Sequence, residues 1–191
     1  MLIKNEFEVA EPVEKVWQFF QNIPQVATCL PGTALTEELD EDKFKGTVAV
    51  RMGPVRLQFA GTADITERDE AARRIVVNAS GAEAKGRGQA TMVVTATLAR
   101  TGRGTRVDVS QDLQLAGAAA QYGRGMISDV TSVLMREFSA NLQDRIARID
   151  RGESVERLTA TPASGLMIGI RAARMALTRV FRRFFLPYQA V

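Results

Sequence analysis

Hydrophobic and polar residues alternate along most of the first 115 positions. In the segment Leu2–Val9, every second residue from Ile3 onward is Ile, Asn, Phe and Val, and charged residues stand between them. This period of two is typical of a strand with one buried face. The same period recurs in residues 34–38, 43–52, 55–67, 72–82, 88–100 and 105–115. Short turns join these segments, which predicts an antiparallel meander.

Helical spacing interrupts the strands once and follows them once. Val13, Val16, Trp17 and Phe20 mark the buried face of a helix that starts near Pro12. Residues 22–30 then form a second short helix or turn, and residues 118–149 a long helix with apolar positions three and four apart. The predicted fold class is α+β: a helix-grip fold in which a curved antiparallel sheet of about seven strands surrounds one long C-terminal helix.

The domain organisation follows from the same pattern. Residues 1–149 form the folded domain. Residues 150–163 are polar, short of large apolar side chains and end near a proline, as in a flexible linker. Residues 164–191 form an appended tail that regains helical spacing.

Charge changes the interpretation of this tail. The chain has 25 basic and 22 acidic residues, and residues 160–191 hold five arginines and no acid. The remainder therefore has 20 basic residues against all 22 acidic ones, so the positive excess belongs to the tail. A nucleic-acid-binding protein would instead have its positive charge on the fold.

The tail is predicted to be an amphipathic helix that lies on an anionic membrane surface without spanning it. Apolar residues gather on one side and arginines largely on the other. Packing of this helix in a partner's groove, or on its own domain, are the alternatives, but the absence of acids for i,i+4 pairing disfavours them. The residues expected to contact the membrane are Leu166, Ile170, Arg171, Arg174, Leu177, Arg179, Phe181, Arg182, Arg183, Phe184 and Phe185.

Catalytic and metal chemistry finds little support in the sequence. There is no histidine, which removes the usual general base and most transition-metal sites. Cys29 is the only cysteine and has no visible base nearby, so we expect a small buried side chain in a reducing compartment. The acids lie mostly on polar faces or in turns, and the start of the chain does not resemble a signal peptide. We expect no catalytic residue and no metal site.

The glycine-rich stretch 117–125 lacks the Gly-Lys-Ser/Thr ending of a phosphate-binding loop. We expect a turn there, with close packing of helix and sheet at Gly123 and Gly125.

The inward-facing residues of the sheet suggest a cavity, because several are small: those in the region of Ala49, and Gly61, Ala63, Ala90 and Ala96. A tightly packed core is the alternative. Asn5 and Gln111 lie on the apolar faces of the first and last strands. They form either a cross-strand amide pair or a donor for a carbonyl-bearing ligand, as Tyr122 also could. The expected ligand-contacting residues are Asn5, Phe7, Phe20, Val50, Phe59, Met92, Val94, Val109, Gln111, Tyr122, Met126, Val130 and Leu134.

Two stretches resemble a known family. Residues 13–17, 23–24 and 29–32 (Val-Glu-Lys-Val-Trp, Ile-Pro and Cys-Leu-Pro-Gly) are similar to the first helices of the carbon monoxide dehydrogenase CoxG family. Residues 117–138, with Tyr122-Gly123, are similar to its last-helix region. The resemblance covers residues 1–149, and Pro31-Gly32 is its most specific part. The wider group is the START/polyketide-cyclase-like (SRPBCC) superfamily.

The resemblance implies a function as well as a fold. A hydrophobic cavity is expected between the sheet and the long helix, with no covalent cofactor. The expected enzyme partner is an aerobic molybdenum-containing carbon monoxide dehydrogenase or a related molybdenum hydroxylase. The other expected partners are the inner face of the cell membrane and an isoprenoid quinone, either menaquinone or ubiquinone. The protein would carry the quinone to the enzyme or recruit the enzyme to the membrane. The alternatives are a cyclase- or hydrolase-like enzyme acting on an apolar substrate, and an assembly factor whose tail binds a protein.

Overall fold

The computed structural model describes residues 1–153. The predicted tail and most of the predicted linker lie outside the described residues. In chain order the elements are β1 (Leu2–Val9), α1 (Val13–Gln21), α2 (Ile23–Cys29), β2 (Thr33–Asp40), β3 (Lys43–Met52), β4 (Val55–Asp69), β5 (Arg74–Glu83), β6 (Gly88–Thr101), β7 (Gly104–Gly117), the 3₁₀ turn η1 (Ala118–Gln121) and α3 (Arg124–Asp150).

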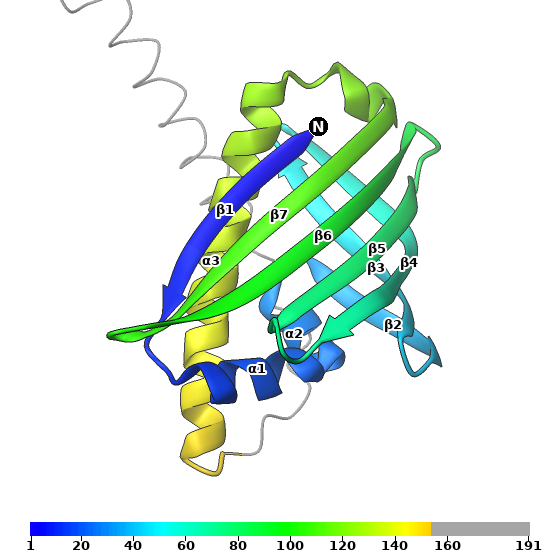
Figure 1. Ribbon diagram of the computed structural model, residues 1–191. Coiled ribbons are helices and arrows are strands. Elements are labelled where there is room, and N and C mark those ends of the chain that lie inside the picture. The colour runs from blue at the N-terminus through cyan, green and yellow to red at the C-terminus, as the bar shows by residue number, and fades with distance from the viewer. Residues whose placement is uncertain (154–191) are drawn as a thin grey trace, which may run out of the picture.

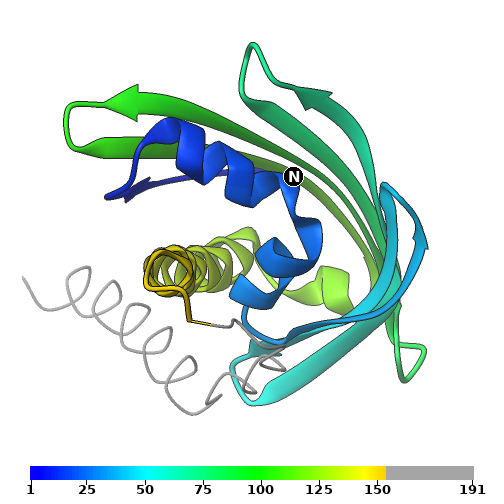
Figure 2. The same cartoon turned by 90° about the horizontal axis from the view of Figure 1, so that it is seen from below.

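The seven strands form one antiparallel sheet in the order β1-β7-β6-β5-β4-β3-β2. The sheet curves around α3, which lies in its concave face and contacts β1 and β3 (Figures 1 and 2). This arrangement confirms the predicted α+β helix-grip fold. Both α1 and α2 cover one end of the concave face, below the sheet in Figure 1. No helix within residues 1–153 is both long and apolar enough to cross a bilayer.

The glycine-rich stretch differs from its prediction. The long helix begins at Arg124 and not at residue 118, because η1 and a short break precede it. The close approach occurs at Gly117, whose φ is +71° and where a Cβ atom would lie 2.6 Å from the carbonyl oxygen of Arg87. At Gly123, where tight packing was expected, a Cβ atom would meet nothing within 4 Å. The turn itself is confirmed.

Gly32 explains why Pro31-Gly32 is a sharp stop after α2. Its φ is +77°, and a Cβ atom would lie 2.3 Å from the carbonyl oxygen of Ala49. Its own carbonyl oxygen accepts a hydrogen bond of 2.9 Å from the amide of Ala49 in β3. Only glycine fits both the left-handed conformation and this close approach. The turn therefore fixes α2 against the edge of the sheet.

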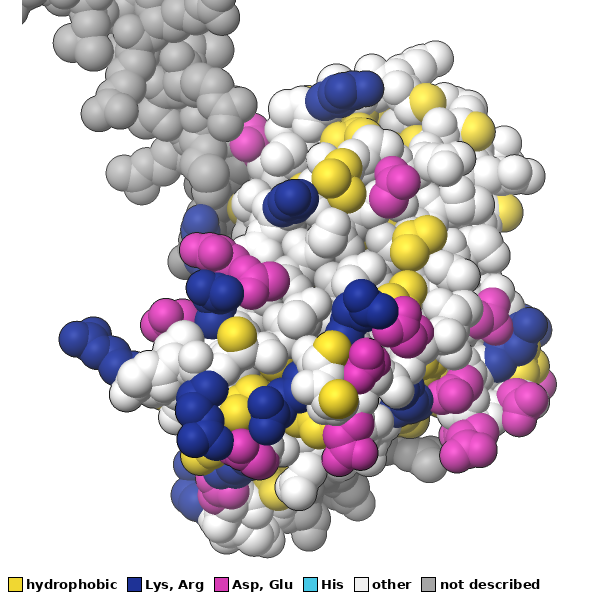
Figure 3. Space-filling model, viewed as in Figure 1, with side chains coloured by type: hydrophobic (Ala, Val, Ile, Leu, Met, Phe, Trp, Pro, Cys, Tyr) yellow, Lys and Arg dark blue, Asp and Glu magenta, His cyan; other side chains and the backbone are white. Residues whose placement is uncertain are grey.

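Charged side chains are distributed unevenly over the surface. On the face shown in Figure 3, acidic side chains gather over the lower part, where the β2–β3 and β4–β5 turns lie, and few occur over the upper part. The upper part contains the β3–β4 and β5–β6 turns and the start of α3.

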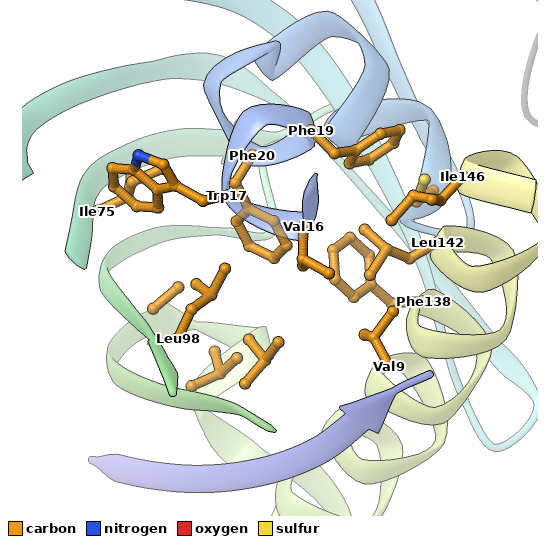
Figure 4. Close-up of a cluster of buried hydrophobic side chains, with 14 of the residues drawn as sticks. Val9, Val16, Trp17, Phe19, Phe20, Ile75, Leu98, Phe138, Leu142 and Ile146 are labelled. Atoms are coloured by element: carbon orange, nitrogen blue, oxygen red, sulfur yellow. The ribbon is translucent and has the colours of Figure 1, made fainter. Parts of the chain in front are cut away.

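The interior consists of two unlike halves. The half covered by α1 and α2, which we call the packed half, is filled by large side chains (Figure 4). The rings of Phe7 and Phe20 each stand edge-on to Phe138, with centroid distances of 5.8 and 6.4 Å. Leu142 is fully buried among them. The opposite half, which we call the hollow half, has a smaller buried cluster: Ile3, Met52, Leu57, Ala119, Ile127 and Val130.

Candidate functional site

A row of small residues crosses four neighbouring strands in the hollow half. Gly46 lies opposite Gly61, Gly61 opposite Gly81, and Gly81 opposite Ala90. The adjacent row pairs Ala63 with Ala79. Because these positions have no side chain or only a methyl group, the sheet leaves a space between itself and α3 that no side chain fills.

This space is a cavity of about 310 Å³, within the range of small-molecule sites. It is open to solvent, since many of its wall residues are half-buried. Its wall consists of Leu30, Thr33, Leu35, Phe44, Gly46, Thr47, Val48, Val50, Met52, Leu57, Phe59, Gly61, Thr62, Ala63, Ala79, Ser80, Gly81, Ala90, Met92, Gln111, Leu113, Leu115, Ala119, Ile127, Val130, Thr131, Leu134 and Met135.

No charged residue lines the cavity within the described part of the chain. Gln111, on β7, is only 6% exposed. Its side-chain amide nitrogen makes one weak hydrogen bond, of 3.6 Å, to the sulfur of Met135. Thr33 Oγ1 is buried without a hydrogen-bond partner. The hydroxyl of Thr131 donates to the carbonyl oxygen of Ile127 at 2.8 Å. Gln111 and Thr33 therefore retain hydrogen-bonding capacity that a ligand could use.

Both interpretations of the interior, cavity and tight core, describe part of the molecule. Six of the predicted ligand-contacting residues line the cavity: Val50, Phe59, Met92, Gln111, Val130 and Leu134. They remain candidates for ligand contact.

Four predicted residues lie instead in the packed half: Phe7, Phe20, Val94 and Val109. The strand residues among them face inward as expected, with Val94 directly opposite Gln111, and Phe20 faces the same core from α1. The aromatic side chains of α1 fill that space. These four residues therefore belong to the core of the packed half and do not line the cavity, so their contact with a ligand stays a prediction.

Three further predictions also change. Met126 is 45% exposed on α3, and Tyr122 packs behind the hollow-half cluster without lining the cavity. Asn5 borders a separate groove between β1 and α3, where its Oδ1 accepts a hydrogen bond from Ser132 at 3.4 Å. The predicted adjacency of β1 and β7 is confirmed, but Asn5 lies opposite Val109 and its Nδ2 atom has no partner. The amide pair with Gln111 is therefore not formed.

Sequence reasoning missed a buried acid. Glu83, 3% exposed, lies opposite Phe59 at the end of β5. Hydrogen bonds from the side chain of Arg87 (2.7 and 3.2 Å) and from two backbone amides lower the pKa of this carboxyl to about 2. Glu83 continues the series of every second residue formed by Ile75, Val77, Ala79 and Gly81. Extending this alternation by one position would have placed Glu83 on the inward face. The carboxylate is occupied by these donors and does not line the cavity.

Leu30, Thr33 and Leu35 were also missed as wall residues. Alternation is weak in β2, and its pairing with β3 has two register shifts, so its inward face could not be assigned from the pattern.

Cys29 is buried, and this burial raises the pKa of its thiol to about 11. The thiol is therefore protonated at neutral pH and unsuited to nucleophilic work. Nearby, Asn141 of α3 donates to the carbonyl oxygen of Cys29 at 2.9 Å, and the buried guanidinium of Arg145 donates to Thr28. These contacts fasten α2 to α3. No group of His, Cys, Asp and Glu side chains in residues 1–153 could hold a metal ion.

The curved sheet, the gripped helix and the apolar cavity between them define a helix-grip fold with an internal cavity. Solved structures share this fold. A conserved protein from Geobacillus kaustophilus has a TM-score of 0.68 and 20% identity, covering 78% of this chain and 96% of its own. The aromatase/cyclase ZhuI from Streptomyces sp. R1128 has a TM-score of 0.57 and 15% identity, covering 79% and 96%.

At the level of sequence, the family model named for CoxG, a component of carbon monoxide dehydrogenase, matches residues 6–147. The chain therefore belongs to the CoxG family. No curated protein matches the chain in a sequence search.

Proposed function

We propose that this protein is a non-enzymatic carrier that holds an apolar molecule in its cavity and serves a carbon monoxide dehydrogenase. The observation that carries the proposal is the cavity wall, which is open, almost wholly apolar and free of charged residues among those described. Burying an apolar chain against such a wall is favourable by about 25 cal/mol per Å². General acid–base catalysis needs an ionisable group at the substrate, and this wall offers none within residues 1–153.

The proposed ligand is a respiratory quinone. An isoprenoid quinone combines a long apolar chain with ring carbonyl oxygens, and the cavity combines apolar walls with the donor-capable amide of Gln111. The family name links this protein to carbon monoxide dehydrogenase, and a quinone held in the cavity could accept electrons from that enzyme. In this proposal the protein moves quinone between the membrane and the enzyme.

Ala79 and Ala82 provide a matched pair for testing the cavity. Both lie on β5, but Ala79 lines the cavity and Ala82 is exposed on the outer face. Wild-type protein from a quinone-replete host, extracted with organic solvent, should yield quinone by mass spectrometry. We expect Ala79→Leu to lose at least about 10-fold of this quinone and Ala82→Leu to retain it. A wild-type protein without quinone, or equal yields from both variants, would overturn the proposal.

Membrane docking is the second part of the proposal and is assigned to residues 164–191. Five arginines at about 1 kcal/mol each give reversible binding to an anionic surface. Replacing Arg179, Arg182 and Arg183 by Gln should weaken flotation with phosphatidylglycerol vesicles by about 10-fold or more. Unchanged flotation would contradict the proposal that the tail docks on the membrane.

Recruitment of the enzyme is testable separately. Purified carbon monoxide dehydrogenase should float with phosphatidylglycerol vesicles only when this protein is added. Pull-down of the enzyme without lipid would show that the two proteins bind directly. Absence of both would remove the enzyme as partner while leaving the cavity experiment unaffected.

A further inference from the structure

The hollow half ends in a group of basic side chains that have no ion-pair partner among the described residues. Arg56, Lys85 and Arg124 are exposed and Arg51 is half-exposed. No carboxylate of the described part lies within ion-pair distance of any of them. We call these four residues, with the exposed side chain of Met126, the basic end.

Hydrogen bonds bring the three segments of the basic end together. Arg87, in the β5–β6 turn beside Lys85, donates from its guanidinium to the carbonyl oxygen of Arg56 at 3.2 Å. The carbonyl oxygen of Arg87 accepts from the amide of Ala118, the first residue of η1, at 2.7 Å, and η1 leads into α3 through Tyr122 and Gly123. The β3–β4 turn, the β5–β6 turn and the start of α3 therefore form one continuous surface, at the top of Figure 1.

Two of these arginines stand where a basic residue destabilises the fold. Arg51 lies directly opposite Arg56 in the β3–β4 ladder, and both side chains point to the outer face. Like charges opposite one another in a sheet repel. Arg124 is the first residue of α3, where the positive end of the helix dipole disfavours a cation. Positions that violate local rules at one surface indicate a requirement outside the fold.

The start of α3 is also left without its usual partners. Gly123 provides no side-chain cap, and the first turn contains no acidic residue. Free amide groups at the start of a long helix bind phosphate well. The acids near this end are engaged: Glu83 is held by Arg87, and Asp112 pairs with the amino group of Met1. Asp129 also has an interaction partner.

We propose that the basic end docks on the phosphate groups of an anionic bilayer, with Met126 entering the interface. A bilayer suits this surface better than an acidic protein does, because the cavity for an apolar molecule lies directly behind it. Docking by this end would place the hollow half against the source of its ligand, whereas the tail alone sets no orientation. The inference rests on the proposed membrane role but concerns the folded domain.

The first test removes three positive charges from the basic end of the full chain. Arg56→Gln/Lys85→Gln/Arg124→Gln is compared with Lys4→Gln/Arg103→Gln/Arg136→Gln, which removes three basic residues that lie elsewhere and form no ion pair with the described residues. In flotation with phosphatidylglycerol vesicles, the first variant should bind between about 10-fold and 100-fold more weakly and the second within about 3-fold of wild type. Equal binding by both variants would overturn the proposal.

The same comparison in a chain whose tail arginines are replaced separates the two docking elements. Residual vesicle binding that disappears on removal of the basic end supports the inference, whatever the tail does. If the first variant keeps its vesicle binding but loses a complex with purified dehydrogenase, the basic end is a protein interface and the inference is wrong.

A second test reads the orientation directly. Cys29 is buried, so with Cys29→Ala a polarity-sensitive dye can be attached at Met126→Cys or, as control, at Leu39→Cys. Leu39 is 44% exposed and is the second-last residue of β2, which ends at the β2–β3 turn, away from the basic end in Figure 1. Brominated phosphatidylglycerol vesicles should quench the dye at position 126 and leave the dye at position 39 unchanged. Equal quenching at the two positions, or none at 126, would overturn the proposed orientation.

Discussion

The packed and hollow halves share one sheet and one helix, yet only the packed half is filled. Five of the aromatic side chains, Phe7, Trp17, Phe19, Phe20 and Phe138, fill the packed half. In the hollow half a patch of glycine and alanine on the sheet leaves unfilled space in front of the same helix, although larger apolar side chains such as Phe59 and Leu57 complete the wall. The contrast indicates that residues at one end of the strands stabilise the fold, whereas residues at the other end of the same strands leave room for a ligand. Substitutions in the two halves should therefore have different consequences.

The strongest test of this contrast uses two leucines of α3 that lie two turns apart. Leu142 is fully buried in the packed half, whereas Leu134 is half-buried at the cavity wall. We expect Leu142→Ala to lower the free energy of unfolding by about 3–5 kcal/mol, because it leaves a void among close-packed neighbours. Leu134→Ala should cost about 1 kcal/mol, since its site already borders empty space. Urea unfolding measures both, and equal losses would contradict the division.

The opposite change, enlarging an alanine, should also separate the halves. Ala96 lies between Ile75 and Val109 in the packed half, and Ala79 lines the cavity. Ala96→Leu should destabilise the fold by about 1–3 kcal/mol through overpacking. Ala79→Leu should leave the free energy of unfolding within about 0.5 kcal/mol of wild type, because its side chain enters unoccupied volume. A larger loss for Ala79→Leu, by chemical denaturation, would show that the cavity has no room.

Gln111 stands at the boundary between the halves. If its amide binds a ligand carbonyl, Gln111→Leu should weaken binding of decylubiquinone about 10-fold while leaving binding of squalene, which has no carbonyl, unchanged. Thr131→Val is the matched control, because Thr131 lines the cavity and its hydroxyl is already bonded to Ile127 within its own helix. Fluorescence titration measures both affinities. Equal effects on the two ligands would mean that Gln111 lines the cavity without binding the ligand carbonyl.

The sequence alone predicts the fold well and the site only in part. Alternation assigned the inward face of the central strands correctly, because side-chain direction is a local property of each strand. It could not distinguish Val50, which lines the cavity, from Val109, which does not. That distinction depends on the register that brings Gly46, Gly61 and Gly81 into one row, and register is a long-range property.

The same limit explains the residues placed in the wrong half. Phe7 and Phe20 were assigned to the cavity because they face the interior, and nothing near them in sequence shows that Phe138 meets both. Glu83 was missed for another reason. An acid was assumed to be solvated, although a hairpin that returns Arg87 and two backbone amides to its carboxylate can satisfy it when buried.

Glu83 also gives the smallest effect and the finest test of how the hollow half is stabilised. Arg87 and the backbone donors hold the pKa of Glu83 at about 2, below its usual 4.5. A lowered pKa stabilises the fold above about pH 4.5 and the benefit disappears as the pH falls toward 2. Glu83→Gln should therefore flatten the loss of unfolding free energy over this interval, and the exposed acid Glu41, changed to Gln, should not. Parallel curves for wild type and Glu83→Gln would mean that the carboxylate contributes equally to folded and unfolded chains. A flattened curve would show that the ionised carboxylate of Glu83, held by Arg87 at the end of β5, stabilises the hollow half in addition to its small buried cluster.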